Sequence, residues 1–184
     1  MAVCVQRIYH ERRTMTPTIR DIAEFYRLAL QYSNSNRRLV QLSDITAWVD
    51  GLIASSDIAY EWMIDLSFAQ STEDMLRGLC HVPVIATNYL GASIFASYLG
   101  QLWLSGTFQR DEMCRLLWNI RDEVRPEHNI DAIVPEVTLE DAEASFGQGL
   151  RDPKKFTRVN DAIDAFFSLY DEFSLMIPPI SGVS

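Results

Sequence analysis

The sequence is poor in metal-binding residues, with only three histidines and three cysteines among 184 residues. His10, His81 and His128 lie far apart, and none ends a Glu-x-x-His motif or belongs to a His-Glu-x-x-His motif. Carboxylate-bridged metal bundles and zinc hydrolases need such paired ligands on one helix face. We therefore expect neither a bound metal nor another cofactor.

The cysteines are too few and too irregularly spaced to form a disulfide framework. Cys4, Cys80 and Cys114 are odd in number and have no Cys-x-x-Cys spacing, which is typical of reduced thiols in a cytoplasmic protein. A chain of this length buries enough surface to fold without disulfides. We expect Cys80 and Cys114 to be buried as small apolar side chains.

Motifs of nucleophilic and nucleotide-binding enzymes are also missing, since there is no Gly-x-Ser-x-Gly, no Walker sequence and no complete dinucleotide loop. The one spacing compatible with general acid–base chemistry is that of Asp57, Glu61 and Asp65, predicted on one helix face. Because Trp62 and Leu66 occupy the neighbouring face, we expect these carboxylates to face water. An enzyme using them is the least favoured alternative.

No stretch alternates apolar and polar residues for long enough to form a strand, whereas apolar residues recur at helical spacing. This pattern predicts an all-α, single-domain bundle of about seven helices over residues 16–177. We expect a disordered extension over residues 1–15 and a mobile tail over 178–184. The helix start signals are Thr18 with Asp21, Ser43 or Asp44, Asp57, Ser71 with Asp74, Pro83, Thr107, Thr138 with Asp141, and Pro153.

The bundle is expected to surround one apolar helix over residues 83–105, because no Asp, Glu, Lys or Arg occurs from 82 to 109. Ala92, Ala96 and Gly100 recur four residues apart, so one side of this helix allows a neighbouring backbone to approach closely. Asn88 and Gln101 interrupt the run, and no basic cluster flanks it. Both features argue against a membrane span.

The last predicted helix has an apolar seam that suits either the core of the bundle or a second copy of the chain. A homodimer is therefore left open. Asp161, Asp164, Asp171 and Glu172 are placed on its outer side. The seam residues alternate at spacings of three and four: Phe156, Val159, Ile163, Phe166, Tyr170, Phe173 and Ile177.

The net charge of −9 is unevenly distributed along the chain. Residues 1–38 contain seven arginines against three acids, a balance of +4, and the remainder has nine basic and 22 acidic residues, a balance of −13. Nucleic acids require a positive surface, so they are disfavoured as partners. An acidic body suits a basic protein partner.

Acidic residues are densest between residues 122 and 143, where apolar residues are interleaved and only Arg125 opposes them. Such a mixture suits a protein-binding surface, with charges that steer encounter and apolar residues that supply a desolvated centre. The alternative is a solvated acidic loop that keeps the protein soluble. The predicted partner-binding residues are Asp122, Glu123, Glu127, Asp131, Glu136, Glu140, Asp141 and Glu143.

The chain resembles the small, acidic, all-helical immunity proteins that bacteria encode beside polymorphic or contact-delivered toxins. The residues that carry the resemblance are 45–50 (ITAWVD), 61–67 (EWMIDLS) and the acidic segment 122–143. It implies a cytoplasmic protein that occludes a basic toxin or enzyme without performing chemistry. The alternative is a ligand-binding or regulatory bundle with an apolar pocket beside the small face of the central helix.

Overall fold

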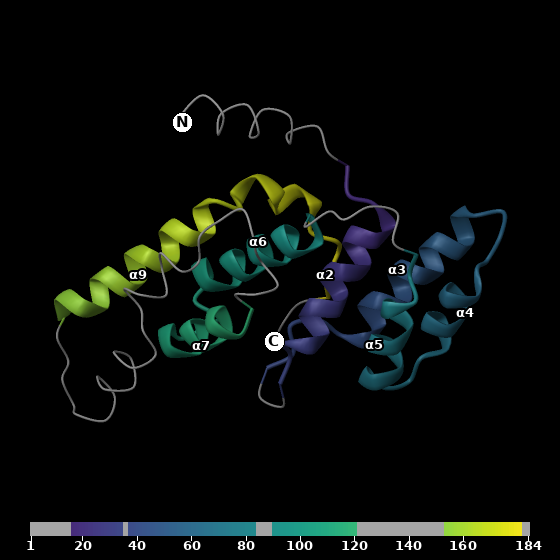
Figure 1. Ribbon diagram of the computed structural model, residues 1–184, viewed down its shortest axis with the longest axis horizontal. Coiled ribbons are helices and arrows are strands. Elements are labelled where there is room, and N and C mark those ends of the chain that lie inside the picture. Colours follow the sequence, from purple (N-terminus) through teal and green to yellow (C-terminus); the bar gives the residue numbers. More distant parts are fainter. Residues whose placement is uncertain (1–15, 35–36, 84–89, 121–152, 182–184) are drawn as a thin grey trace. The chain divides into compact units, whose positions relative to one another are not determined.

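The computed structural model describes residues 16–34, 37–83, 90–120 and 153–181, and these ranges contain eight helices (Figure 1). The described part has no strand, only an isolated bridge between Asn34 and Arg37. The all-α prediction is therefore confirmed. The chain groups into two compact units, residues 1–91 with 178–184, and residues 92–177. The prediction of one domain stays a prediction, and the expected extension over 1–15 lies outside the described residues.

The first unit contains four helices, which are α2 (Ile19–Gln31), α3 (Leu42–Ser55), α4 (Glu61–Phe68) and α5 (Thr72–Cys80). Helix α3 packs on α4, α2 packs on α5, and α4 packs on α5. Large apolar side chains from all four helices fill the core. They include Phe25, Tyr26, Leu28, Ile45, Val49, Trp62, Met63, Leu66, Met75 and Leu79.

Two of the predicted helix starts in this unit are confirmed by their hydrogen bonds. The Thr18 N–H donates to Asp21 Oδ2 (2.8 Å) and the Asp21 N–H donates to Thr18 Oγ1 (3.2 Å), which forms a capping box. At the start of α5, the Asp74 N–H donates to Ser71 Oγ (3.1 Å). Such caps satisfy N–H groups that the first turn of a helix cannot pair.

The start of α3 differs from the prediction. The cap residue is Gln41 rather than Ser43 or Asp44, and its N–H donates to Asp44 Oδ2 (2.8 Å). Asp44 is therefore the third residue of the helix, where a carboxylate still compensates the unpaired N–H groups and the helix dipole.

The start of α4 was also predicted wrongly. The helix begins at Glu61, because the backbone of Tyr60 is still extended (φ −75°, ψ 153°), and Asp57 does not cap it. Ile58 was expected to face inward from this helix, but it precedes the helix and is exposed.

Cys80 was expected to be buried and is exposed, because the buried side of α5 is formed by Met75, Gly78 and Leu79.

Residues 178–181 belong to the first unit, where Pro178 is buried and the Ser181 N–H donates to Asp44 Oδ1 (3.0 Å). Residues 182–184 lie outside the described ranges, so the mobile tail expected over 178–184 stays a prediction. The Ser181 hydroxyl also bonds to this oxygen. Asp44, which is buried, thus accepts hydrogen bonds from the start of its own helix and from residue 181.

The second unit contains α6 (Leu90–Leu104), α7 (Arg110–Ile120), α9 (Pro153–Ser168) and the 3₁₀-helix η2 (Asp171–Met176). Helix α6, whose first two residues belong to the first unit, is the described part of the predicted central helix. Pro83 is not helical, residues 84–89 lie outside the described ranges, and the end at Leu104 agrees with the prediction. None of the described helices has both the length and the apolar character that a membrane span needs.

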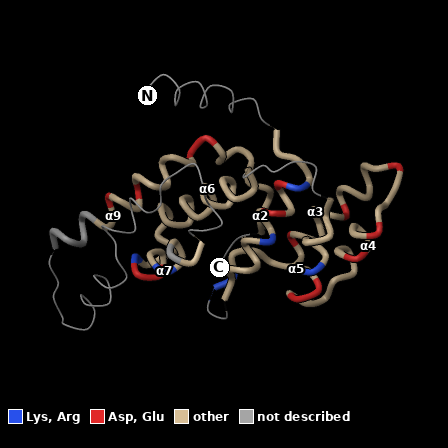
Figure 2. Tube along the Cα trace, viewed as in Figure 1, with Lys and Arg blue, Asp and Glu red and all other residues tan. Residues whose placement is uncertain are grey.

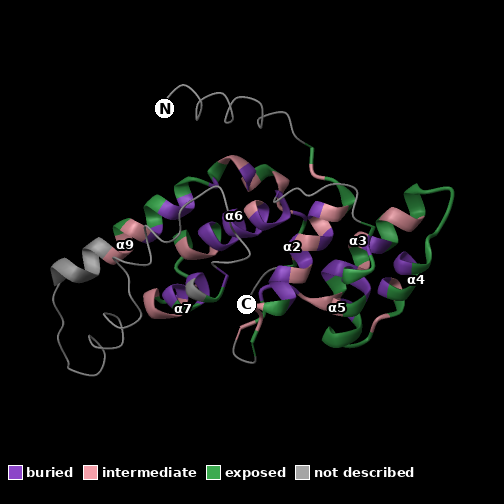
Figure 3. Cartoon of the chain, in the orientation of Figure 1, coloured by how far each residue is buried: buried purple, intermediate pink, exposed green. Residues whose placement is uncertain are grey.

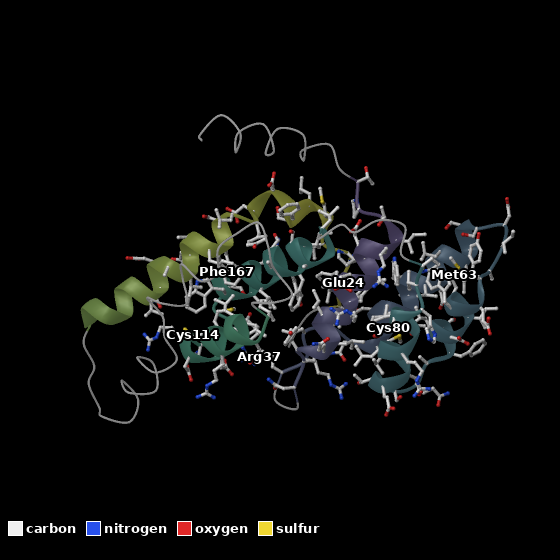
Figure 4. The ribbon with its side chains drawn as sticks, viewed as in Figure 1. Glu24, Arg37, Met63, Cys80, Cys114 and Phe167 are labelled. Atoms are coloured by element: carbon white, nitrogen blue, oxygen red, sulfur yellow. The ribbon has the colours of Figure 1, made fainter. Side chains whose placement is uncertain are left out.

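Helix α6 is buried along most of its length, as Figure 3 shows. A Cβ at Gly100 would lie 3.0 Å from Phe167 Cβ, so α9 approaches the predicted small face closely (Figure 4). The Trp103 indole N–H donates to Asp164 Oδ1 (2.6 Å) one turn further along. Gly106, with a φ of 73°, ends the helix in the left-handed conformation that glycine favours.

The apolar seam of the last predicted helix is confirmed where it is described, but the helix is not continuous. Helix α9 ends at Ser168, and η2 carries the seam onward. Ile163, Phe166, Tyr170 and Phe173 are buried, and the Phe166 and Tyr170 rings are 5.1 Å apart. These four side chains therefore pack within the chain, and the homodimer stays a prediction.

Candidate partner-binding surface

The acidic segment predicted to bind a partner lies outside the described residues. The structure therefore assigns no position to Asp122, Glu123, Glu127, Asp131, Glu136, Glu140, Asp141 or Glu143. The candidate surface that the structure does describe lies on α4, in the first unit.

Helix α4 has an apolar side that faces water. Among the described residues, eight large apolar side chains are exposed, and four of them lie within residues 58–68. Their exposed fractions are 62% for Ile58, 56% for Tyr60, 44% for Ile64 and 78% for Phe68. Single exposed apolar residues are ordinary, whereas a contiguous group is typical of an interaction surface.

The opposite side of α4 explains why this group stays exposed. Trp62, Met63 and Leu66 are buried, and α3 and α5 both pack on the helix. A Cβ at Gly78 of α5 would lie 2.6 Å from Leu66 Cδ2, so the absence of a side chain there lets α5 pack tightly on α4. With the core-facing side occupied, the residues at 60, 64 and 68 point away from it.

Carboxylates lie beside the apolar residues. Asp57, Glu61 and Asp65 are all exposed, as the sequence predicted, but Asp57 lies before the helix, so the three do not form a line on one helix. None of the three is paired with a cation among the residues that the structure describes. We name this group of seven residues the α4 face: Asp57, Ile58, Tyr60, Glu61, Ile64, Asp65 and Phe68.

The surroundings of the α4 face are also negative. No Lys or Arg occurs between Arg38 and Arg77, a stretch that contains seven acidic residues. Figure 2 shows the acidic positions recurring along α3, α4 and α5. Arg77 lies beside its own acids on α5, 3.4 Å from Glu73 Oε1 and 3.6 Å from Asp74 Oδ1. It therefore offers little neutralisation to the α4 face.

Sequence reasoning identified the exposed carboxylates but missed the apolar part of the α4 face. Tyr60, Ile64 and Phe68 recur at four-residue spacing, and this spacing was the available signal. It was hidden because Trp62, Met63 and Leu66 make the other side of the helix apolar too. With no wholly polar side, the periodicity did not indicate which residues face the core.

Other chemically capable groups are buried or isolated. Burial raises the pKa of the Cys114 thiol to about 11, Arg110 lowers it to a smaller extent, and Asp111 raises it. A thiol of this kind is protonated and a poor nucleophile at neutral pH. Within the described ranges, no group of three or more His, Cys, Asp or Glu side chains could hold a metal ion.

Comparisons with known proteins add no relative. No protein-family model matches the chain, and searches of curated proteins and of solved structures found no similar protein.

Proposed function

We propose that this chain is a protein-binding module whose partner is a basic protein. The observation that carries the proposal is the α4 face, where exposed apolar side chains lie beside carboxylates that have no cation partner among the described residues. The acids attract a positively charged partner and orient it during encounter. Tyr60, Ile64 and Phe68 then lose contact with water when the partner docks, which supplies the favourable free energy.

The resemblance to immunity proteins gives this module a specific role, which is also a proposal. The chain neutralises a basic toxin or enzyme by covering its functional surface, and it needs no catalytic group to do so. The acidic segment 122–143 is a second part of the contact surface in this proposal, since it repeats the mixture of carboxylates and apolar residues.

The test is a capture experiment with three forms of the full chain. The wild type, a variant with Asp57→Lys, Glu61→Lys and Asp65→Lys, and a control with Asp161→Lys, Asp171→Lys and Glu172→Lys are immobilised. Each is exposed to extract of the native source and eluted in salt steps. Both variants change the net charge equally, but the control changes carboxylates of α9 and η2.

We expect one basic protein, identified by mass spectrometry, to be retained by the wild type and the control and lost by the α4 variant. Retention by all three would contradict the α4 face as the binding surface. Loss from the control alone would place the contact on α9 and η2 instead. A variant that no longer folds is recognised from its circular dichroism spectrum and is replaced by the neutral set Asp57→Asn, Glu61→Gln and Asp65→Asn.

A further inference from the structure

We infer that the element received by the α4 face is an amphipathic helix of another protein, with lysine or arginine on the flank of its apolar stripe that meets Glu61 and Asp65. This inference rests on the proposed function and specifies the partner's chemistry. Tyr60 directly precedes α4, and Ile64 and Phe68 follow at intervals of four residues. These positions form a ridge of the kind that packs into the groove of a second helix.

The positions of the carboxylates on the α4 face indicate which side chains the partner helix carries beside its apolar stripe. Glu61 and Asp65 each follow a residue of the ridge by one position, and Asp57 precedes the helix. Glu61 and Asp65 therefore lie on the same side of the ridge. A helix whose apolar stripe covered Ile64 and Phe68 would bring the side chains of one flank close to these carboxylates. Lysine or arginine there would be attracted, whereas glutamate or aspartate would be repelled.

The same carboxylates argue against two other partners that could cover the α4 face, which are a second copy of this chain and an anionic membrane. A second copy of this chain would bring its own Asp57, Glu61 and Asp65 against the same residues, and like charges in contact oppose association. An anionic membrane would be repelled for the same reason. A helix with basic residues beside its apolar stripe is thus the occupant that suits both the apolar ridge and the carboxylates beside it.

The experiment uses the full chain and defined peptides. The first peptide is about 18 residues long, which gives five helical turns, with leucine on one side and lysine on its flanks. The second has the same composition in scrambled order, and the third replaces lysine with glutamate. Binding is measured by titration calorimetry, and the contact is located by NMR signals of Ile64 and Phe68.

We expect the first peptide to bind and to shift the signals of Ile64 and Phe68. The scrambled peptide should bind about tenfold more weakly, since its charge is kept while the helical stripe is lost. The variant Ile64→Ser with Phe68→Ser should weaken the first peptide by about tenfold or more, whereas the exposed control Leu175→Ser should leave its affinity unchanged. The glutamate peptide should not bind.

Equal binding of the ordered and scrambled peptides would overturn the inference, because charge alone would then explain it. Binding that leaves Ile64 and Phe68 unperturbed, or a preference of the protein for neutral lipid vesicles over the first peptide, would overturn it as well. Each result separates the inference from the proposed function. If the natural partner is still lost from the α4 variant, the binding role stands and only the helical nature of the partner fails.

Discussion

At the scale of single residues, Tyr26 is a buried side chain whose hydroxyl group makes no hydrogen bond among the described residues. Its ring is fully buried, 5.4 Å from the ring of Trp48, and its hydroxyl has no hydrogen-bond partner among the described residues. Burial, and then the negative charge of Asp44, raise the pKa of Tyr26. The hydroxyl is therefore held protonated and away from water.

We predict that Tyr26→Phe leaves the free energy of unfolding at pH 7 unchanged or raises it by about 1 kcal/mol, because it removes a desolvated hydroxyl without opening a cavity. Urea denaturation of the two proteins measures the difference. A decrease of more than about 1 kcal/mol would show that the hydroxyl is hydrogen-bonded in solution.

A second prediction at this scale concerns pH and Cys114. The thiol has an ordinary pKa of 9.0, and burial raises it to about 11 in the folded protein. Between these values the unfolded chain loses the proton and the folded chain keeps it, so the folded state loses stability as pH rises. We expect the free energy of unfolding to fall more steeply across this window in the wild type than in Cys114→Ala. Equal slopes would contradict a buried, protonated thiol.

At the scale of secondary-structure elements, close approach between helices depends on glycine. A Cβ at Gly91 would lie 2.5 Å from the Asp21 carbonyl oxygen of α2 and 2.7 Å from Glu24 Cβ. Gly51, within α3, has nothing within 4 Å of the corresponding position. The two glycines occupy the same kind of backbone but differ in what surrounds them, which makes them a matched pair.

We predict that Gly91→Ala lowers the free energy of unfolding by about 1–3 kcal/mol, because backbone atoms must move to admit the methyl group. Gly51→Ala should raise it by up to about 1 kcal/mol, since alanine favours the helix and meets no neighbour. Denaturation curves of both variants test the pair. A stabilising Gly91→Ala would show that α2 does not approach α6 at this point.

At the same scale, Ser181 near the C-terminus is hydrogen-bonded to Asp44 in the first turn of α3. Ser181→Ala removes the hydroxyl that donates to the buried Asp44. We expect a loss of about 1 kcal/mol in the free energy of unfolding, and a smaller loss for Ser181→Thr, which keeps the hydroxyl. Identical free energies of unfolding for the wild type and both variants would mean that the Ser181 hydroxyl does not bond to Asp44 in solution.

The elements also show what the sequence could and could not predict. Thr18 with Asp21 and Ser71 with Asp74 predicted helix starts correctly, because a cap is a local interaction within four residues. Ile163 and Phe166 were placed correctly because polar residues separate the seam from the outer side of α9. Tyr60 and Phe68 were missed because both sides of α4 are apolar, and only the packing of α3 and α5 decides which side is buried.

At the scale of the whole molecule, the uneven charge is the feature that directs function. The chain has a net charge of −9, and the carboxylates of the α4 face have no cation partner within the part of the chain that the structure describes. Opposite charges attract more weakly as salt screens them, whereas burial of apolar side chains depends little on modest salt. Salt therefore separates the two contributions that the α4 face is proposed to make.

The most direct test measures the affinity of the captured basic partner at about 50, 150 and 500 mM salt. The wild type is compared with the neutral variant Asp57→Asn, Glu61→Gln and Asp65→Asn. We predict that the wild-type affinity falls steeply with salt, that the neutral variant binds more weakly with a flatter dependence, and that the two converge at high salt. Parallel curves of equal affinity would contradict the claim that the α4 face receives the partner.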